Sequence, residues 1–194
     1  MKVNKAFVKH FAACGWWLLL LRLDQFSTKN NLFSMKNFLL VAFSLLSLSV
    51  FAQRALPSAT VKKLDGSTFD TAELAKKGHP VIVSFWATWC SPCKKELDAI
   101  SEVYKEWQEK YGVEVIAVTV DDARSAPKVG PMVEQKGWKY QILLDTNEDF
   151  KRALGFETVP HSFLLDKTGN IVYEHNGYVS GDEVEMEEEL AKLK

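Results

Sequence analysis

Cys90 and Cys93, separated by Ser91-Pro92, are the residues of this chain whose type and spacing point most directly to chemistry. They follow the apolar run Pro80–Trp86, where we expect a buried strand to lead into a helix. Two thiols at this spacing can close a small disulfide, and the positive end of a helix favours the thiolate form of the first. The pattern indicates thiol-disulfide exchange, which needs no cofactor.

The same spacing also occurs in zinc sites and in structural disulfides. A zinc site requires about four ligands. The sequence offers one further cysteine, Cys14, and four histidines without paired spacing, His10, His79, His161 and His175. A structural disulfide more usually closes a longer loop, because its effect on the unfolded chain grows with loop length. We predict no metal site and favour redox chemistry, with both alternatives kept open.

The first 52 residues differ in composition from the rest of the chain, with six basic residues, one acidic residue and two apolar runs. Met35-Lys36-Asn37, the run Phe38–Phe51 and the small residue Ala52 follow the order of a secretory signal peptide. The run of about fourteen residues is shorter than the roughly twenty that span a bilayer. We therefore expect residues 35–52 to be a cleaved signal, and an uncleaved membrane anchor is the alternative.

Because Met35 begins a complete signal, residues 1–34 are interpreted as an upstream extension from a misassigned start codon. Phe11-Ala12-Ala13-Cys14 resembles a lipid-attachment sequence, but Lys9 and His10 stand where its hydrophobic centre should be. The signal predicts an exported protein of the periplasm or cell envelope. It would be soluble after cleavage near Ala52 and membrane-anchored without cleavage.

The chain after Ala52 has 142 residues, which suits one domain with a hydrophobic core. It carries 18 basic and 24 acidic residues, a net charge of −6, so nothing indicates a nucleic-acid partner. Cys90 and Cys93 are its only cysteines. In an oxidising compartment such a pair is expected to cycle, or to be held reduced by a partner. We expect a monomer.

The elements that position the cysteines can be predicted from apolar and turn residues. We expect a linker over 53–59 and one domain over 60–194. Asp65-Gly66 lies between two short β-prone segments, Thr60–Lys63 and Ser67–Phe69, which predicts an opening β-hairpin.

Pro80–Trp86 and Val113–Val120 have the near-continuous apolar character of strands buried on both faces. Helix Ser91–Lys110 separates them, so the two strands are most simply parallel, joined by a right-handed crossover. Later elements are expected to be a helix Ala126–Lys136 broken at Gly130-Pro131, a strand Gln141–Leu144, a helix Glu148–Leu154 capped by Asn147, a hairpin of Ser162–Asp166 and Ile171–Asn176, and a final helix capped by Ser180.

A βαβ unit with Cys-x-x-Cys at its strand-helix junction, followed by an antiparallel hairpin and a last helix, resembles the thioredoxin architecture. The segments Ser84–Glu96 and Thr158–Phe163 resemble the cysteine motif and the proline loop of the exported thioredoxin-like TlpA/ResA family. The resemblance covers roughly residues 60–194. It implies an α/β thioredoxin-like fold, a central mixed sheet flanked by helices, with the opening hairpin as an N-terminal extension.

The resemblance also implies roles for individual residues. Pro160 is expected to be cis and to lie against the disulfide, with Val159 facing an extended substrate. Cys90 would attack a substrate disulfide as the thiolate, and Cys93 would resolve the mixed disulfide. Pro92 loses little by lacking an amide proton near a helix start. Trp89 is expected to cover the site, although a tryptophan is more often simply part of the core.

Glu96 is the predicted proton partner of the cysteines, as the family resemblance implies, and burial would raise its pKa. The alternative is a solvated helical glutamate. Ser84 stands where thioredoxin has a buried acid, and Asp98 where these families usually have a helix-kinking proline. His161 is either a residue that meets substrate or the thiolate, or a surface histidine.

The resemblance therefore implies a protein disulfide oxidoreductase, with protein disulfides as substrates and an unidentified upstream electron donor. A reductase of specific partners is the favoured direction, and a disulfide oxidase or isomerase is an alternative. A Cu(I) carrier that uses the same two thiolates, with His161 as the only further ligand nearby, is another. A peroxidase is disfavoured because the segment before Cys90 lacks the proline and threonine pattern of a peroxiredoxin.

Overall fold

The structure is a computed structural model whose described residues are 54–194. The predicted signal peptide and upstream extension, residues 1–52, lie outside them. Arg54–Ala55, within the segment expected to be a linker, form strand β1, which pairs antiparallel with β8 (Asn170–Asn176). Leu56 is buried as well. The linker prediction is therefore corrected, because this segment closes one edge of the sheet.

The described residues form an eight-stranded mixed sheet in the order β1-β8-β7-β4-β5-β6-β2-β3. Its other strands are β2 (Thr60–Lys63), β3 (Thr68–Asp70), β4 (Val81–Trp86), β5 (Glu114–Thr119), β6 (Gln141–Leu144) and β7 (His161–Leu165). Strands β4, β5 and β6 are parallel, and the remaining pairs are antiparallel. The predicted mixed sheet, parallel βαβ unit and opening hairpin are confirmed.

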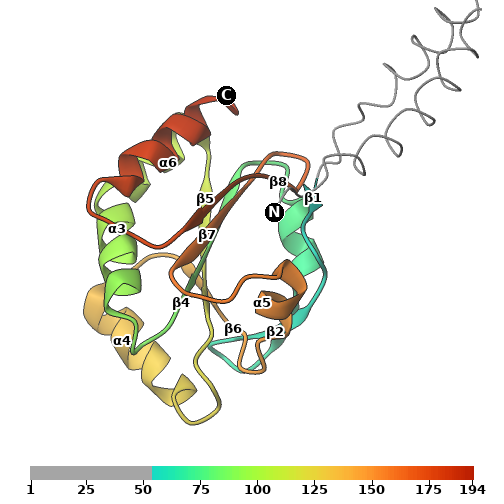
Figure 1. Ribbon diagram of the computed structural model, residues 1–194, viewed down its shortest axis with the longest axis vertical. Coiled ribbons are helices and arrows are strands. Elements are labelled where there is room, and N and C mark those ends of the chain that lie inside the picture. Colours follow the sequence, from blue (N-terminus) through green and yellow to red (C-terminus); the bar gives the residue numbers. More distant parts are fainter. Residues whose placement is uncertain (1–53) are drawn as a thin grey trace, which may run out of the picture. The chain divides into compact units, whose positions relative to one another are not determined.

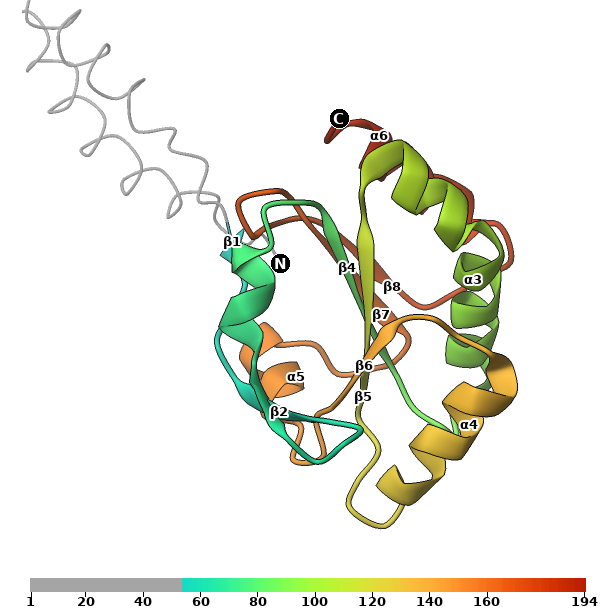
Figure 2. The ribbon, with the colours of Figure 1, turned by 180° about the vertical axis from the view of Figure 1, so that it is seen from behind.

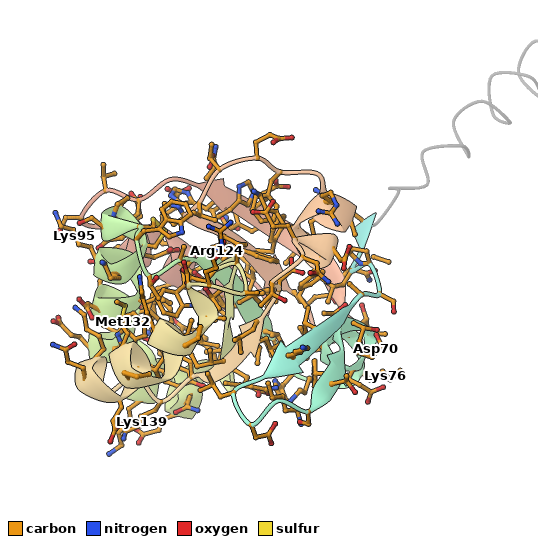
Figure 3. All side chains as sticks on the ribbon, turned by 90° about the horizontal axis from the view of Figure 1, so that it is seen from below. Asp70, Lys76, Lys95, Arg124, Met132 and Lys139 are labelled. Atoms are coloured by element: carbon orange, nitrogen blue, oxygen red, sulfur yellow. A yellow bond between two sulfur atoms is a disulfide. The ribbon has the colours of Figure 1, made fainter. Side chains whose placement is uncertain are left out.

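Helices cover both faces of the sheet. On one face lie α3 (Ser91–Tyr111), α4 (Val129–Lys136) and α6 (Asp182–Ala191), and on the other lie α5 (Asp149–Leu154) and the 3-10 helix η1 (Thr71–Lys76) (Figures 1 and 2). Viewed from below, Met132 on α4 and Lys76 on η1 lie on opposite sides of the sheet (Figure 3). This layering leaves the central strands without solvent contact.

The central strands and α3 build the core around the cysteine motif. All six residues of β4 are buried, as its near-continuous apolar sequence predicts. Helix α3 places Cys93, Leu97 and Ile100 on its buried side, with Tyr104 and Trp107 further along the same stripe. Among the helices described over 54–194, none is long and apolar enough to cross a membrane.

Three local predictions are wrong. The expected helix over 126–136 breaks before Val129, into the 3-10 helix η2 (Ala126–Lys128) and α4, so that Pro131 lies in the first turn of α4 where its missing N–H costs little. The N-cap residue of α5 is Glu148, not Asn147, and the amides of the first turn at Phe150 and Lys151 donate to the Asp145 carboxylate instead. Gly181, not Ser180, is the N-cap of α6.

Candidate active site

Cys90 and Cys93 form a disulfide at the start of α3, with their Cα atoms 5.4 Å apart. Cys90 is the N-cap residue of the helix, and its Sγ accepts a hydrogen bond from the Cys93 amide at 3.2 Å. Pro92 lies in the first turn, where a backbone N–H would have no acceptor within the helix, so the lack of one costs little. Cys93 is completely buried and Cys90 retains 5% exposure. The pair is therefore asymmetric, and Cys90 is the cysteine that keeps some exposure.

The loop before Cys90 is fixed by a buried carboxylate. Asp121, which follows β5 and is fully buried, accepts from the Thr88 amide at 2.8 Å and from the Thr88 hydroxyl at 2.7 Å. It also accepts from the Thr119 hydroxyl at 2.6 Å. The Lys94 Nζ donates to the Thr88 carbonyl at 2.9 Å. Thr88 is thus held from both sides, which fixes the backbone that presents Trp89 and Cys90.

The proline loop lies directly against the disulfide. The Val159-Pro160 peptide is cis, as the family resemblance implied. The Val159 carbonyl oxygen lies 3.8 Å from Cys90 Sγ. The Gly177 amide donates to the Pro160 carbonyl at 2.9 Å, which ties the loop to the end of β8. Trp89 is 67% exposed beside Cys90 and forms part of the surface around it.

Glu96 lies one helical turn after Cys93 and is 4% exposed. Its Oε1 accepts from the Ser162 hydroxyl at 2.6 Å, and its Oε2 accepts from the Ser84 hydroxyl at 3.3 Å. Burial raises the pKa of Glu96 to about 7, against the opposing effect of the two hydroxyl donors. The interpretation of Glu96 as a solvated surface residue is therefore wrong.

Strand register explains why both hydroxyls reach one carboxylate. Ser84 of β4 pairs directly with Ser162 of β7, so the two side chains stand side by side on the face that α3 covers. Ser84, which replaces the buried acid of thioredoxin, is itself fully buried. In thioredoxin a strand supplies the buried carboxyl group. Here helix α3 supplies it as Glu96, and the serine hydroxyls of β4 and β7 donate hydrogen bonds to it.

Two further residues singled out in the sequence lie in defined surroundings. His161 is 5% exposed, its Nε2 lies 2.8 Å from Glu174 Oε1, and its ring stacks on Phe156 at 4.3 Å between centroids. The interpretation of His161 as a surface histidine is therefore wrong. Asp98 contacts Lys136 Nζ at 2.6 Å and Trp138 Nε1 at 3.0 Å, and α3 continues through it without interruption.

Sequence reasoning missed Asp121, Ser162 and the partners of Lys94. Asp121 follows the strand expected to end at Val120, a position where an acid ordinarily faces water. Ser162 was read only as the start of a strand. A signal for each was present, since Thr88 and Ser84 are polar residues within an apolar strand-to-helix segment that need buried partners. The partner itself depends on strand order, which local patterns do not contain.

A redox-active cysteine pair at a helix start, facing a cis-proline loop across a mixed sheet, defines the class of thioredoxin-like thiol-disulfide oxidoreductases. Comparison with known proteins supports the same class. Residues 52–174 match the model of the AhpC/TSA family. The thiol-disulfide oxidoreductase ResA of Bacillus thuringiensis (strain Al Hakam) is 35% identical over 129 residues, which cover 66% of this chain and 72% of ResA.

Solved structures agree with this assignment. An uncharacterized thioredoxin-like protein from Porphyromonas gingivalis superposes with a TM-score of 0.65 at 44% identity, covering 73% of this chain and 93% of that protein. A thiol:disulfide interchange protein from Chlorobium tepidum TLS gives a TM-score of 0.59 at 28% identity, covering 73% and 96%. The chain belongs to the AhpC/TSA family and is a thiol-disulfide oxidoreductase of the ResA type.

Proposed function

We propose that this protein is an exported reductase of disulfides in specific partner proteins, working through a Cys90–Cys93 dithiol/disulfide cycle. The observation that carries the proposal is the position of Cys90 Sγ, 3.8 Å from the Val159 carbonyl of the cis-proline loop. An extended substrate that lies along Val159 and Pro160 would bring its own disulfide to Cys90. Cys93, one turn further along the helix, is completely buried.

The reaction transfers two electrons from the reduced pair to the substrate. The Cys90 thiolate attacks one sulfur of the substrate disulfide, which forms a mixed disulfide and releases the other substrate sulfur as a thiolate. Cys93, once deprotonated, attacks Cys90 Sγ and releases the first substrate sulfur. The products are a reduced substrate and the Cys90–Cys93 disulfide. A dithiol donor protein must then reduce this disulfide before the next cycle.

Glu96 is the proposed proton partner of the pair. A carboxyl group with a pKa of about 7 exists in both protonation states near neutral pH, so it can take the proton of a thiol and return it. Its place one turn after Cys93 on the buried side of α3 puts it beside the resolving cysteine. Trp89, Val159 and Pro160 are the proposed substrate contacts, while Pro92 shapes the first turn of the helix.

Export is supported by the signal-like segment Met35–Ala52 and by the lone cysteine pair in the chain that follows it. The expected location is the periplasm or cell envelope, either as a soluble monomer after cleavage near Ala52 or through an uncleaved anchor. The copper-carrier alternative gains no support from His161. The Nε2 of this histidine, the ligand that a carrier would need, is engaged with Glu174, its ring packs on Phe156, and its Nδ1 is buried without a hydrogen-bond partner among residues 54–194.

Trapping tests the proposal. In a Cys93→Ser variant the mixed disulfide cannot be resolved, so the reduced variant should accumulate covalent complexes with its substrates in the cell envelope. A Cys90→Ser variant is the matched control and should accumulate none. Complexes formed equally by both variants, or release of the complexes without a reductant, would refute the assigned roles of the two cysteines.

A further inference from the structure

His175 on β8 lies next to the Glu96 site, on a part of the sheet that thiol-disulfide exchange itself does not use. Ser162 pairs directly with Ser84 on one side and with His175 on the other. Directly paired side chains stand on the same face of a sheet, with Cβ atoms about 5 Å apart. The side chain of His175 is therefore the lateral neighbour of the hydroxyl that binds the Glu96 carboxyl group.

The imidazole of His175 is held in place by its own partners. Its Nε2 lies 3.0 Å from Asp182 Oδ2, and its Nδ1 lies 3.1 Å from the Tyr173 hydroxyl. The Tyr173 hydroxyl in turn donates to Glu185 at 2.9 Å. Asp182 also accepts from the Val179 amide at 2.8 Å, which fixes the carboxylate at the start of α6. The histidine side chain is 22% exposed.

We propose that His175, anchored by Asp182, is a positioning residue that acts through Glu96 by placing the charges of the His175–Asp182 pair beside the buried carboxyl group. The proposal deepens the proposed function and rests on it for its catalytic meaning. The positive charge of His175 favours ionised Glu96, and the negative charge of Asp182 favours the protonated carboxyl group.

The electrostatic effects on Glu96 have these signs: His175 lowers its pKa and Asp182 raises it, both as smaller influences than burial and the serine hydroxyls. The titratable groups around His175 come from three elements. Tyr173 on β8 and Asp182 on α6 contact its ring directly, and Glu96 on α3 interacts with its charge. Glu185 contacts Tyr173, and Tyr178 and Glu183 are bonded to each other in the loop and helix that follow. Tyr173 and Tyr178 are hydrogen-bonded to glutamates, and burial raises the pKa of each. His175 and Asp182 are thus the two charged residues whose electrostatic effects reach Glu96.

The coupling can be measured on the oxidised protein, where neither cysteine titrates. The side-chain carboxyl carbon of Glu96, followed by carbon-13 NMR and assigned by its loss in Glu96→Gln, reports the ionisation of this group alone. His175→Gln keeps a donor for Asp182 but removes the charge, and we expect it to raise the Glu96 midpoint by about 0.5 to 1 pH unit. Asp182→Asn should move the midpoint in the opposite direction.

His79→Gln is the matched control, because His79 faces Glu114 at 3.5 Å just before β4 begins, away from Glu96. It should leave the Glu96 midpoint unchanged. A His175→Gln midpoint equal to that of His79→Gln, or shifts of the same sign in His175→Gln and Asp182→Asn, would overturn the proposal. A shifted carboxyl midpoint with an unshifted pH profile of Cys90 alkylation would leave the coupling intact and refute the role of Glu96 in the cycle.

Discussion

The Ser162 hydroxyl donates a 2.6 Å hydrogen bond to Glu96, from a strand 66 residues away in sequence. This bond joins the helix that carries the cysteines to the strand that follows the cis-proline. A hydroxyl donor stabilises the ionised carboxylate and so lowers the pKa that burial has raised. Much of the behaviour expected of the site depends on this balance between burial and hydrogen bonding.

Ser162→Ala should therefore raise the pKa of Glu96 further. We expect a shift of about 0.5 to 1 unit in the pH profile of Cys90 alkylation in the reduced protein. Ser84→Ala is the graded control, because its 3.3 Å bond is longer and its loss should have a smaller effect. A larger shift for Ser84→Ala than for Ser162→Ala would contradict the assigned hydrogen bonds.

Glu96 should also make stability depend on pH. Its folded pKa of about 7 is above the 4.5 of an ordinary glutamate, so the folded protein holds the proton more tightly than the unfolded chain does. This contribution to stability is fully present below pH 4.5 and is lost as the pH rises through 7. From pH 5 to pH 8, the free energy of unfolding of the oxidised wild type, measured with urea, should fall by about 2 to 3 kcal/mol more than that of Glu96→Gln. Parallel curves for the two proteins would contradict the raised pKa.

Asp121→Asn should loosen the loop that presents Cys90. The amide has one acceptor oxygen with two lone pairs, so at least one of the three donors now held by Asp121 loses its acceptor. We expect a loss of about 1 to 3 kcal/mol in the free energy of unfolding. Thr88→Val should lower the free energy of unfolding less, because the backbone amide at position 88 still donates to Asp121. Equal stability of Asp121→Asn and wild type would exclude this network as the support of the loop.

Gly169 tests the packing of the β7–β8 turn on η1. Its φ of +84° lies in the region that favours glycine, and an added Cβ would lie 2.4 Å from the Cβ of Ala75. Gly169→Ala should destabilise the protein by about 2 kcal/mol or more in urea unfolding. Gly130→Ala in α4, where an added Cβ meets nothing within 4 Å, should instead be neutral or stabilising. Equal costs for the two substitutions would contradict the turn packing.

Features that depend on contiguous residues, such as strands and tight turns, could be predicted from the sequence. The apolar runs around Phe85 and Val118 predicted buried parallel strands, and Asp65-Gly66 predicted the opening hairpin; all are present. The predictions that failed concern groups whose partners are distant in sequence or outside the expected element. The sequence around α5 favoured Asn147 as the cap, but Asp145 reaches the same amides from the end of β6. Arg54 joins the sheet because β8 offers an open edge and Glu174 accepts from its guanidinium at 2.9 Å.

The active site divides in the same way. Cys90, Cys93 and Glu96 share one helix, so their spacing alone placed them together. The hydroxyls that hold Glu96, and the histidine beside them, come from β4, β7 and β8, and only the strand order brings them into one row. No local pattern in the sequence specifies that row.

The equilibrium reduction potential of Cys90–Cys93 tests the central claim most directly. It can be measured by equilibrating the protein with dithiothreitol or glutathione buffers and trapping free thiols. A reductase requires a value near that of thioredoxin, about −270 mV, at which the reduced pair donates electrons to substrate disulfides. A value near the roughly −120 mV of a strong oxidant such as DsbA would contradict the proposed direction.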